Sequence, residues 1–175
     1  MGSTVSYASL ANDLQVFAHT VKYWLQILEN LYVIFPVRSY HHNIASSILK
    51  DSKYYFFDTG QVEGNEGQRL ENTVACALLA ELHKLEDTQG KKTSLHFLRD
   101  KEKREIDFLT VVDKRPTCLV EVKWDDQNIS KNFNAFLKYL GPLPAYQIVY
   151  QLKRPLTTPQ VSLVAAEDFL VELKI

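Results

Sequence analysis

The stretch at residues 104–124, "REIDFLTVVDKRPTCLVEVKW", is mostly apolar and β-branched and predicts a hairpin with strands at about 105–112 and 117–124. Its apolar runs also carry charges: Asp107 in the first strand, Glu121 and Lys123 in the second. Side chains alternate along a strand, so Glu121 and Lys123 share a face. Directly opposed residues of an antiparallel pair point the same way. Asp107 therefore joins that face if it opposes Glu121 or Lys123.

That register requires a loop of odd length. A three-residue loop from "DKRP", at 113–115 or 114–116, meets the requirement. Two neighbouring carboxylates repel each other unless a cation lies between them, and hard divalent cations such as Mg²⁺ or Mn²⁺ prefer oxygen ligands. The spacing alone leaves two interpretations open: a metal site that includes Asp107 and Glu121, or a structural cluster of ion pairs at a sheet edge.

Glu71 extends the same pattern. The apolar stripe Leu70, Val74, Leu78 and Leu82 predicts a helix over about 68–85, and Glu71 lies beside that stripe. A carboxylate in this place can point towards the sheet. The alternative is a first-turn Glu that only complements the helix dipole.

Residues 1–58 predict a partial winged helix-turn-helix that lacks its first helix. Ser6 is a candidate N-cap of one helix, and the stripe Val21, Trp24, Leu25, Leu28 and Leu31 predicts a second helix after a short turn. "YVIFPV" and "KYYFFD" then predict two strands. This arrangement suggests that the sequence is the C-terminal part of a larger protein. A two-helix adaptor without a DNA role is the alternative.

The Gly-rich stretch "DTGQVEGNEGQRLE" predicts a boundary, with a second unit at 59–175. Its helix at 68–85 is followed by a strand in "SLHFLRD", the hairpin, a helix in "SKNFNAFLKYLG" with Ser130 as N-cap, and a strand in "AYQIVYQL". A last strand at 161–165 and a short helix in "AEDFLVEL" close the chain. The αβββαβ order predicts an α/β (α+β) fold with a mixed central sheet.

The composition limits the functional classes. The 175 residues have a net charge of −1, so DNA binding would depend on local basic patches. The two cysteines, Cys76 and Cys118, lie in apolar runs, as expected for buried thiols in a reducing compartment. The sequence has neither a signal peptide nor an apolar run of about 20 residues, which predicts a cytoplasmic protein without a membrane partner.

A Glu on the opening helix, an Asp on the second strand and Glu-x-Lys on the third resemble the PD-(D/E)xK nuclease superfamily. The strings "YYFFDTG", "RLENTVACALLAEL", "REIDFLTVV" and "CLVEVKW" further resemble the C-terminal domain of unknown function that follows an AAA-type ATPase module in many bacterial and archaeal proteins. In that family a winged-helix segment links the ATPase to the nuclease-like domain. The similarity covers nearly the whole chain.

The resemblance implies a restriction-endonuclease-like fold and a Mg²⁺- or Mn²⁺-dependent nuclease that acts on DNA. It implies Asp107 and Glu121 as metal ligands, Glu71 as a ligand or as a residue that orients one, and Lys123 as the catalytic cation. It also implies an ATPase module in the same or parent polypeptide as a partner. Further basic residues are candidates for phosphate contacts: Lys22, Arg99, Lys101, Lys103 and Arg104.

Other functions remain open. No Walker motif occurs, so the chain itself does not hydrolyse ATP by that route. The main alternative is a catalytically inactive nuclease-like module that binds nucleic acid or protein and regulates an ATPase. A metal-free hydrolase is weaker, since its candidate histidines have no Ser or Cys partner in a recognisable motif: His41, His42, His83 and His96. Homo-oligomer formation is also left open.

Overall fold

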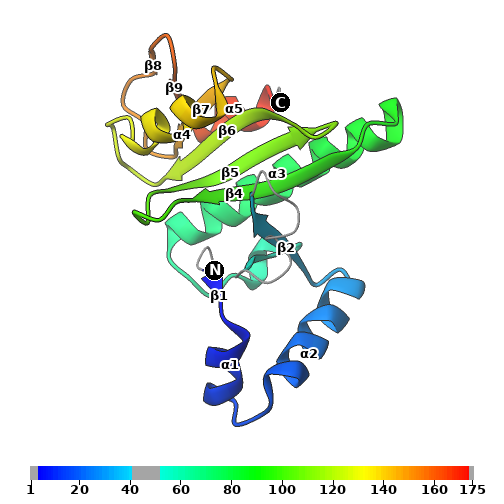
Figure 1. Cartoon of the computed structure of the whole chain (residues 1–175). Helices are drawn as coiled ribbons and strands as arrows, with labels where there is room; N and C mark the ends of the chain where they lie inside the picture. Colours follow the sequence, from blue (N-terminus) through cyan, green and yellow to red (C-terminus); the bar gives the residue numbers. More distant parts are fainter. Residues whose placement is uncertain (1–3, 41–51, 174–175) are drawn as a thin grey trace.

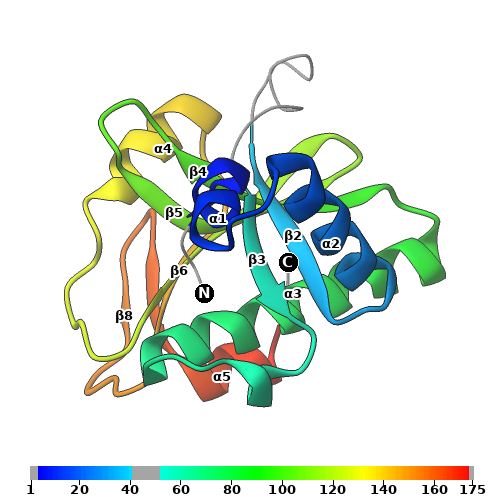
Figure 2. The ribbon, with the colours of Figure 1, turned by 90° about the horizontal axis from the view of Figure 1, so that it is seen from below.

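The computed structural model describes residues 4–40 and 52–173. Within these residues nine strands form a single mixed sheet in the order β1-β3-β2-β4-β5-β6-β7-β9-β8 (Figure 1). Two apolar clusters pack against it. One contains residues of helices α3 and α5, and the other contains residues of helix α4. Seen from below, α3 and α5 accordingly lie on one side of the sheet and α4 on the other (Figure 2).

The first part of the chain supplies two helices and one edge of the sheet. Its elements are β1 (Thr4–Val5), α1 (Tyr7–Asp13), α2 (Ala18–Asn30), β2 (Ile34–Ser39) and β3 (Ser52–Phe56). As expected, the side chain of Ser6 caps α1, accepting a hydrogen bond from the backbone N–H of Ser9. Residues 41–51, which include His41 and His42, lie outside the described residues.

The second part follows the element order expected from the sequence. After a short 3₁₀ turn (Thr59–Gln61) its elements are α3 (Glu66–Gln89), β4 (Thr93–Arg99), β5 (Glu105–Val112), β6 (Arg115–Lys123), α4 (Asn132–Leu140), β7 (Ala145–Val149), β8 (Leu156–Thr157), β9 (Ser162–Ala165) and α5 (Ala166–Val171). The mixed α/β fold and the helix, three strands, helix, strand order are thus confirmed. Helix α3 is longer than expected because Asn65 and Gln68 form a capping box before it, and Gly90, at φ 65°, ends it.

The expected boundary at residues 58/59 falls between β3 and α3, yet the sheet is continuous across it. Strand β2 pairs with β3 on one side and runs parallel to β4 on the other. The two β-rich runs of the first unit therefore extend the sheet of the second, and they bring β3 close to the expected site.

The apolar stripe of α2 is only partly buried. Val21 is buried, whereas Trp24, Leu28 and Leu31 are exposed. In Figure 1, α1 and α2 project away from the sheet. The stripe expected to form a helix-turn-helix core is thus largely open to solvent within the described structure. None of the helices in residues 4–40 and 52–173 is long and apolar enough to cross a membrane.

Two local expectations were wrong. The hairpin loop has two residues, Asp113 and Lys114, both with positive φ, and β6 already begins at Arg115. The strand register that a loop of odd length would have produced comes instead from a β-bulge. The β5–β6 register shifts by one residue between Thr110 and Val111. Ser130 is also not the N-cap of α4. That position is Lys131, and the Ser130 hydroxyl accepts from the backbone N–H of Asn132.

Candidate functional site

A second β-bulge determines the position of Asp107. The β4–β5 register shifts between His96 and Leu98, so Asp107 and Phe108 together oppose the single residue Phe97. Such a bulge re-aims side chains and is common beside functional sites. The ring of Phe108 packs against Tyr55 of β3, and the carboxylate of Asp107 meets Lys53 of the same strand. Both bulge residues thus reach β3.

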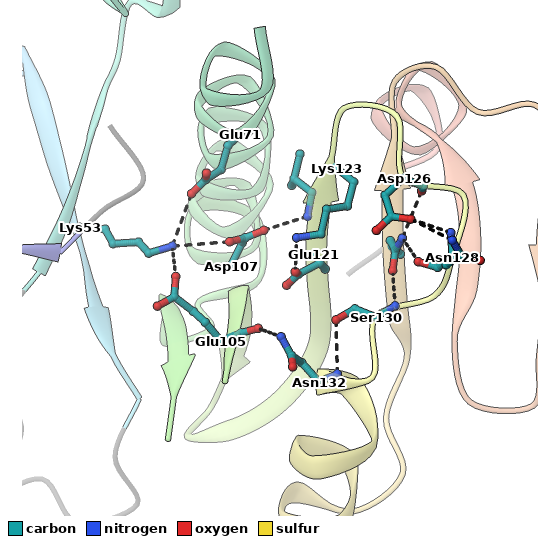
Figure 3. A network of polar contacts seen from close by, with 12 residues as sticks. Lys53, Glu71, Glu105, Asp107, Glu121, Lys123, Asp126, Asn128, Ser130 and Asn132 are labelled. Carbon is teal, nitrogen blue, oxygen red and sulfur yellow. Dashed lines mark hydrogen bonds and ion pairs between the residues drawn. The ribbon is translucent and has the colours of Figure 1, made fainter. Parts of the chain in front are cut away.

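Lys53 lies at the centre of this region. Only 1% of its side chain is exposed, which is unusual for a lysine. Its ammonium Nζ lies 2.7 Å from Glu105 Oε1, 3.5 Å from Asp107 Oδ1 and 3.5 Å from Glu71 Oε1 (Figure 3). We call these four residues, Lys53, Glu71, Glu105 and Asp107, the Lys53 cluster. The carboxylates come from α3 and from the start of β5, so the cluster ties three elements together.

The Lys53 cluster shifts the ionisation of its members. Burial disfavours the charged ammonium, but the nearby Asp107, Glu71 and Glu105 outweigh it and raise the pKa of Lys53. Burial and the charge of Asp107 raise the pKa of Glu71, although Lys53 and Tyr55 oppose this. The Tyr55 hydroxyl donates to Glu71 Oε1 at 2.6 Å. One ammonium thus serves three carboxylates, and it compensates the charge of Glu71 only in part.

Asp107 also links the cluster to strand β6. Its Oδ2 accepts a hydrogen bond from the backbone N–H of Val122 at 2.9 Å. The β5–β6 ladder is recorded from Phe108, which pairs with Val120, and one step further along the same register Asp107 opposes Glu121. The register expected from the sequence is therefore present, although bulges rather than the loop produce it.

Glu121 and Lys123 form the second half of the site. Lys123 Nζ lies 2.7 Å from Glu121 Oε1. Glu121 is 3% exposed, and its Oε2 has no hydrogen-bond partner among the described residues. Burial and the charge of Asp107 raise the pKa of Glu121 to about 7, although Lys123 lowers it in part. Lys123 is more open to solvent. Burial lowers its pKa, but the carboxylates of Glu121 and Asp107 outweigh this and keep the pKa raised.

The buried amide of Gln147 supports this half of the site. It pairs with Glu121 across the β6–β7 ladder. Its side-chain Oε1 accepts from the backbone N–H of Ser130, and its Nε2 donates to the carbonyl of Asn128. These bonds hold the segment between β6 and α4 against the sheet, next to Glu121.

The structure places all four residues of the expected constellation in one region, but not as a single carboxylate cluster. Glu71 and Asp107 share Lys53, while Glu121 is paired with Lys123. Across residues 4–40 and 52–173 there is no group of three or more His, Cys, Asp or Glu side chains arranged to hold a metal ion. The cation at the centre of the carboxylates is the ammonium of Lys53.

The basic candidates for phosphate contacts occupy two places. Lys22 is exposed on α2, far along the chain from the others. Lys101 and Lys103 are exposed in the turn between β4 and β5. Arg99 lies 3.6 Å from Glu105, and Arg104 pairs with Asp100 at 2.6 Å. The turn is therefore directly connected to the Lys53 cluster through Arg99.

Sequence reasoning missed Lys53, Tyr55 and Glu105. One signal for Lys53 was its place at the head of the aromatic run "KYYFF", where both faces of the strand are buried. Glu105 stands two residues before Asp107, so strand alternation puts both on one face, but local spacing does not show that this face meets Lys53. A contact between residues some 50 positions apart could not be read from local patterns.

Comparison with protein families divides the chain at nearly the same place as the Gly-rich stretch. The family described as "Domain of unknown function (DUF8612)" matches residues 1–63. The family described as "Domain of unknown function (DUF4143)" matches residues 66–166, which is more than half of the chain. The chain belongs to the DUF4143 family. Neither a curated protein nor a solved structure matches it.

Proposed function

We propose that the chain is a nuclease domain of the PD-(D/E)xK type, which hydrolyses phosphodiester bonds of DNA with Mg²⁺ or Mn²⁺. The observation that carries this proposal is the buried carboxylate of Glu121. One of its oxygens holds Lys123, and the other has no hydrogen-bond partner in the described part of the chain. A buried, unpaired carboxylate oxygen costs free energy, which a bound cation would recover.

The chemistry of two neighbouring carboxylates supports one divalent cation in this proposal. The β5–β6 ladder, continued one step beyond Phe108 and Val120, puts Asp107 opposite Glu121, and both supply only carboxylate oxygens, which Mg²⁺ and Mn²⁺ prefer. In this proposal they are the ligands, and Glu71 orients Asp107 through the shared contact with Lys53. When bound, the cation would supply Lewis-acid activation of a water molecule and of the scissile phosphate.

Lys123 and the β4–β5 turn would act on the substrate. Lys123 is the most exposed member of the site, at 36%, and its raised pKa keeps it protonated at neutral pH. Its ammonium would stabilise negative charge that develops on the phosphate. The hydrogen bond from Val122 to Asp107 fixes the carboxylate in place. Lys101 and Lys103 would contact phosphates further along the DNA.

The element order α3-β4-β5-β6-α4-β7 supports a restriction-endonuclease-like core in this proposal. Helices α1 and α2 with β2 and β3 would then be the winged-helix-like segment that adjoins an AAA-type ATPase module of the parent polypeptide. Activity on DNA beside such an ATPase would take place in the cytoplasm. These assignments depend on the sequence resemblance.

The experiment is a cleavage assay. The purified chain is incubated with supercoiled and linear DNA in Mg²⁺, in Mn²⁺ and in EDTA. Asp107→Asn and Lys123→Met should each abolish cleavage, whereas Lys84→Met should not, because Lys84 pairs with Glu81 on the exposed face of α3. Cleavage that persists unchanged in Asp107→Asn and in Lys123→Met contradicts the proposal.

One observation favours a second candidate, an inactive nuclease-like module that binds nucleic acid or protein and regulates an ATPase. The ammonium of Lys53 already balances carboxylates that a metal would otherwise neutralise. Fluorescence anisotropy with labelled DNA separates the two candidates. Binding that is equal in Mg²⁺ and in EDTA, without cleavage in either, would support the inactive module.

A further inference from the structure

Lys53 contacts the three carboxylates of Glu71, Glu105 and Asp107 and has almost no contact with solvent. Its Nζ lies within 3.5 Å of Glu71, Glu105 and Asp107, and 5.5 Å from the centre of the Phe97 ring. An ammonium is a compact cation with three donors, so it can face three carboxylates at once. Its charge occupies the middle of the acidic groups, as Figure 3 shows.

The contacts at Asp107 leave neither of its oxygens without a partner. Oδ1 faces Lys53, and Oδ2 accepts from the backbone N–H of Val122. At Glu71, Oε1 is shared between Lys53 and the hydroxyl of Tyr55. A divalent cation that used Asp107 would therefore share an oxygen with an existing donor, and it would lie close to a fixed positive charge.

We infer that Lys53 is a built-in cation that competes with a divalent metal ion for the carboxylates of Asp107 and Glu71, and so weakens metal binding. This inference rests on the proposed function, since it concerns the same site. Two cations close together in a buried region repel strongly because the effective dielectric constant is low there. Metal binding then requires the ammonium to move away from Asp107, or it proceeds with low affinity.

Lys53 and its carboxylate partners lie in two different family segments of the chain. Lys53 lies on β3, which pairs with β1 and β2, within the segment that matches the DUF8612 family. Its carboxylate partners lie in the segment that matches DUF4143. A displacement of β3 relative to α3 and β5 would move the ammonium and change the metal affinity of the site. The segment that matches one family thus supplies the cation that lies among the carboxylates of the segment that matches the other.

The test is calorimetric titration of the whole chain with Mn²⁺, which measures binding without DNA. Lys53→Met removes the charge but keeps an apolar chain of similar length, and it should lower the Kd for Mn²⁺ by tenfold or more. Lys53→Arg retains a cation and should keep the weak affinity of the wild type. Lys84→Met removes one positive charge far from the site and should leave the Kd unchanged.

Lys53→Met leaves three partly buried carboxylates without the ammonium that they share, which favours unfolding. The double variant Lys53→Met/Glu105→Gln removes the carboxylate with the shortest contact, and it serves as the second form of the test. Circular dichroism establishes that each variant is folded before titration. A folded variant without Lys53 that binds Mn²⁺ no more tightly than the wild type overturns the inference.

The outcomes also separate this inference from the proposed nuclease. If only the Lys53 variants bind Mn²⁺, the competition is supported and metal-dependent activity of the wild type is contradicted. If the wild type binds Mn²⁺ and cleaves DNA, and the variants bind no more tightly, the nuclease is supported and the competition is overturned. If no form binds Mn²⁺, both are overturned.

Discussion

The carboxylate of Asp107 accepts a hydrogen bond from the backbone N–H of Val122 at 2.9 Å while its other oxygen faces the ammonium of Lys53. One side chain thus joins β5 to β6 and to β3. The β-bulge at Asp107 and Phe108 makes this possible because it turns both side chains towards β3. The contacts of Asp107 with Val122 and Lys53 therefore hold three strands together, in addition to any role of this carboxylate in metal binding.

The double role of Asp107 predicts a large loss of stability on truncation. Asp107→Ala leaves the Val122 N–H without its acceptor and removes one counter-charge of buried Lys53, so the free energy of unfolding should fall by about 2–4 kcal/mol. Asp107→Asn keeps an acceptor for Val122 and should lose less. Urea unfolding at pH 7 measures both. Equal stability of Asp107→Ala and the wild type would show that the junction does not stabilise the fold.

Glu121 predicts a pH dependence of stability. Its folded-state pKa of about 7 lies above the ordinary value of 4.5, so the folded chain holds this proton more tightly than the unfolded chain. The resulting stabilisation is fully present below about pH 4.5 and is lost as the pH rises through 7. The difference corresponds to about 3 kcal/mol at most.

Glu121→Gln isolates this effect because it cannot ionise. The free energy of unfolding of Glu121→Gln minus that of the wild type should increase by about 1–3 kcal/mol between pH 5 and pH 8. A constant offset from the lost contact with Lys123 does not affect this change. A difference that is the same at both pH values contradicts the raised pKa.

The hairpin shows how far the sequence could predict the site. Alternation and pairing rules allowed Asp107 to oppose either Glu121 or Lys123, and the recorded pairing of Phe108 with Val120 continues in the register that matches Glu121. They could not reveal that a bulge beside Thr110 supplies the odd offset, since a bulge depends on packing against neighbouring strands. The expected three-residue loop was wrong for the same reason: Asp113 and Lys114 close a two-residue turn.

Lys53 and α2 show two features that local sequence patterns could not predict. Helix α3 and the strands at 105–112 were predictable because their periodicity is strong over many residues. The partners of Lys53 lie on α3 and β5, and only the tertiary arrangement brings them together. The stripe of α2 was identified correctly as apolar, but periodicity does not say what covers it, and in the described structure Trp24 and Leu31 are exposed.

The two thiols should differ in reactivity. Burial raises the pKa of Cys118 to about 12, and it also raises the pKa of the half-buried Cys76. At pH 8 the thiolate fraction of Cys118 is on the order of 10⁻⁴, so an aromatic disulfide reagent should not modify it in the folded chain. Cys76→Ser should then show no reactive thiol until urea is added. Rapid modification of folded Cys76→Ser would show that Cys118 is accessible.

The turn between β5 and β6 offers a stabilising substitution. Asp113 and Lys114 have φ values of 48° and 66°, and both form the two-residue loop of the hairpin. Such turns favour Asn-Gly or Asp-Gly, because a side chain at positive φ is strained and glycine is not. Lys114→Gly creates Asp-Gly and should raise the free energy of unfolding by about 0.5–1 kcal/mol.

Thermal unfolding of Lys114→Gly measures this gain, and Lys114→Ala provides the control, since it removes the same charge but retains the Cβ. Lys114→Ala should be no more stable than the wild type. Because the bulge between Thr110 and Val111, and not the turn, sets the register at Asp107, the gain should come with unchanged metal binding or cleavage. A Lys114→Gly variant less stable than Lys114→Ala would contradict the positive φ at this position and, with it, the two-residue loop.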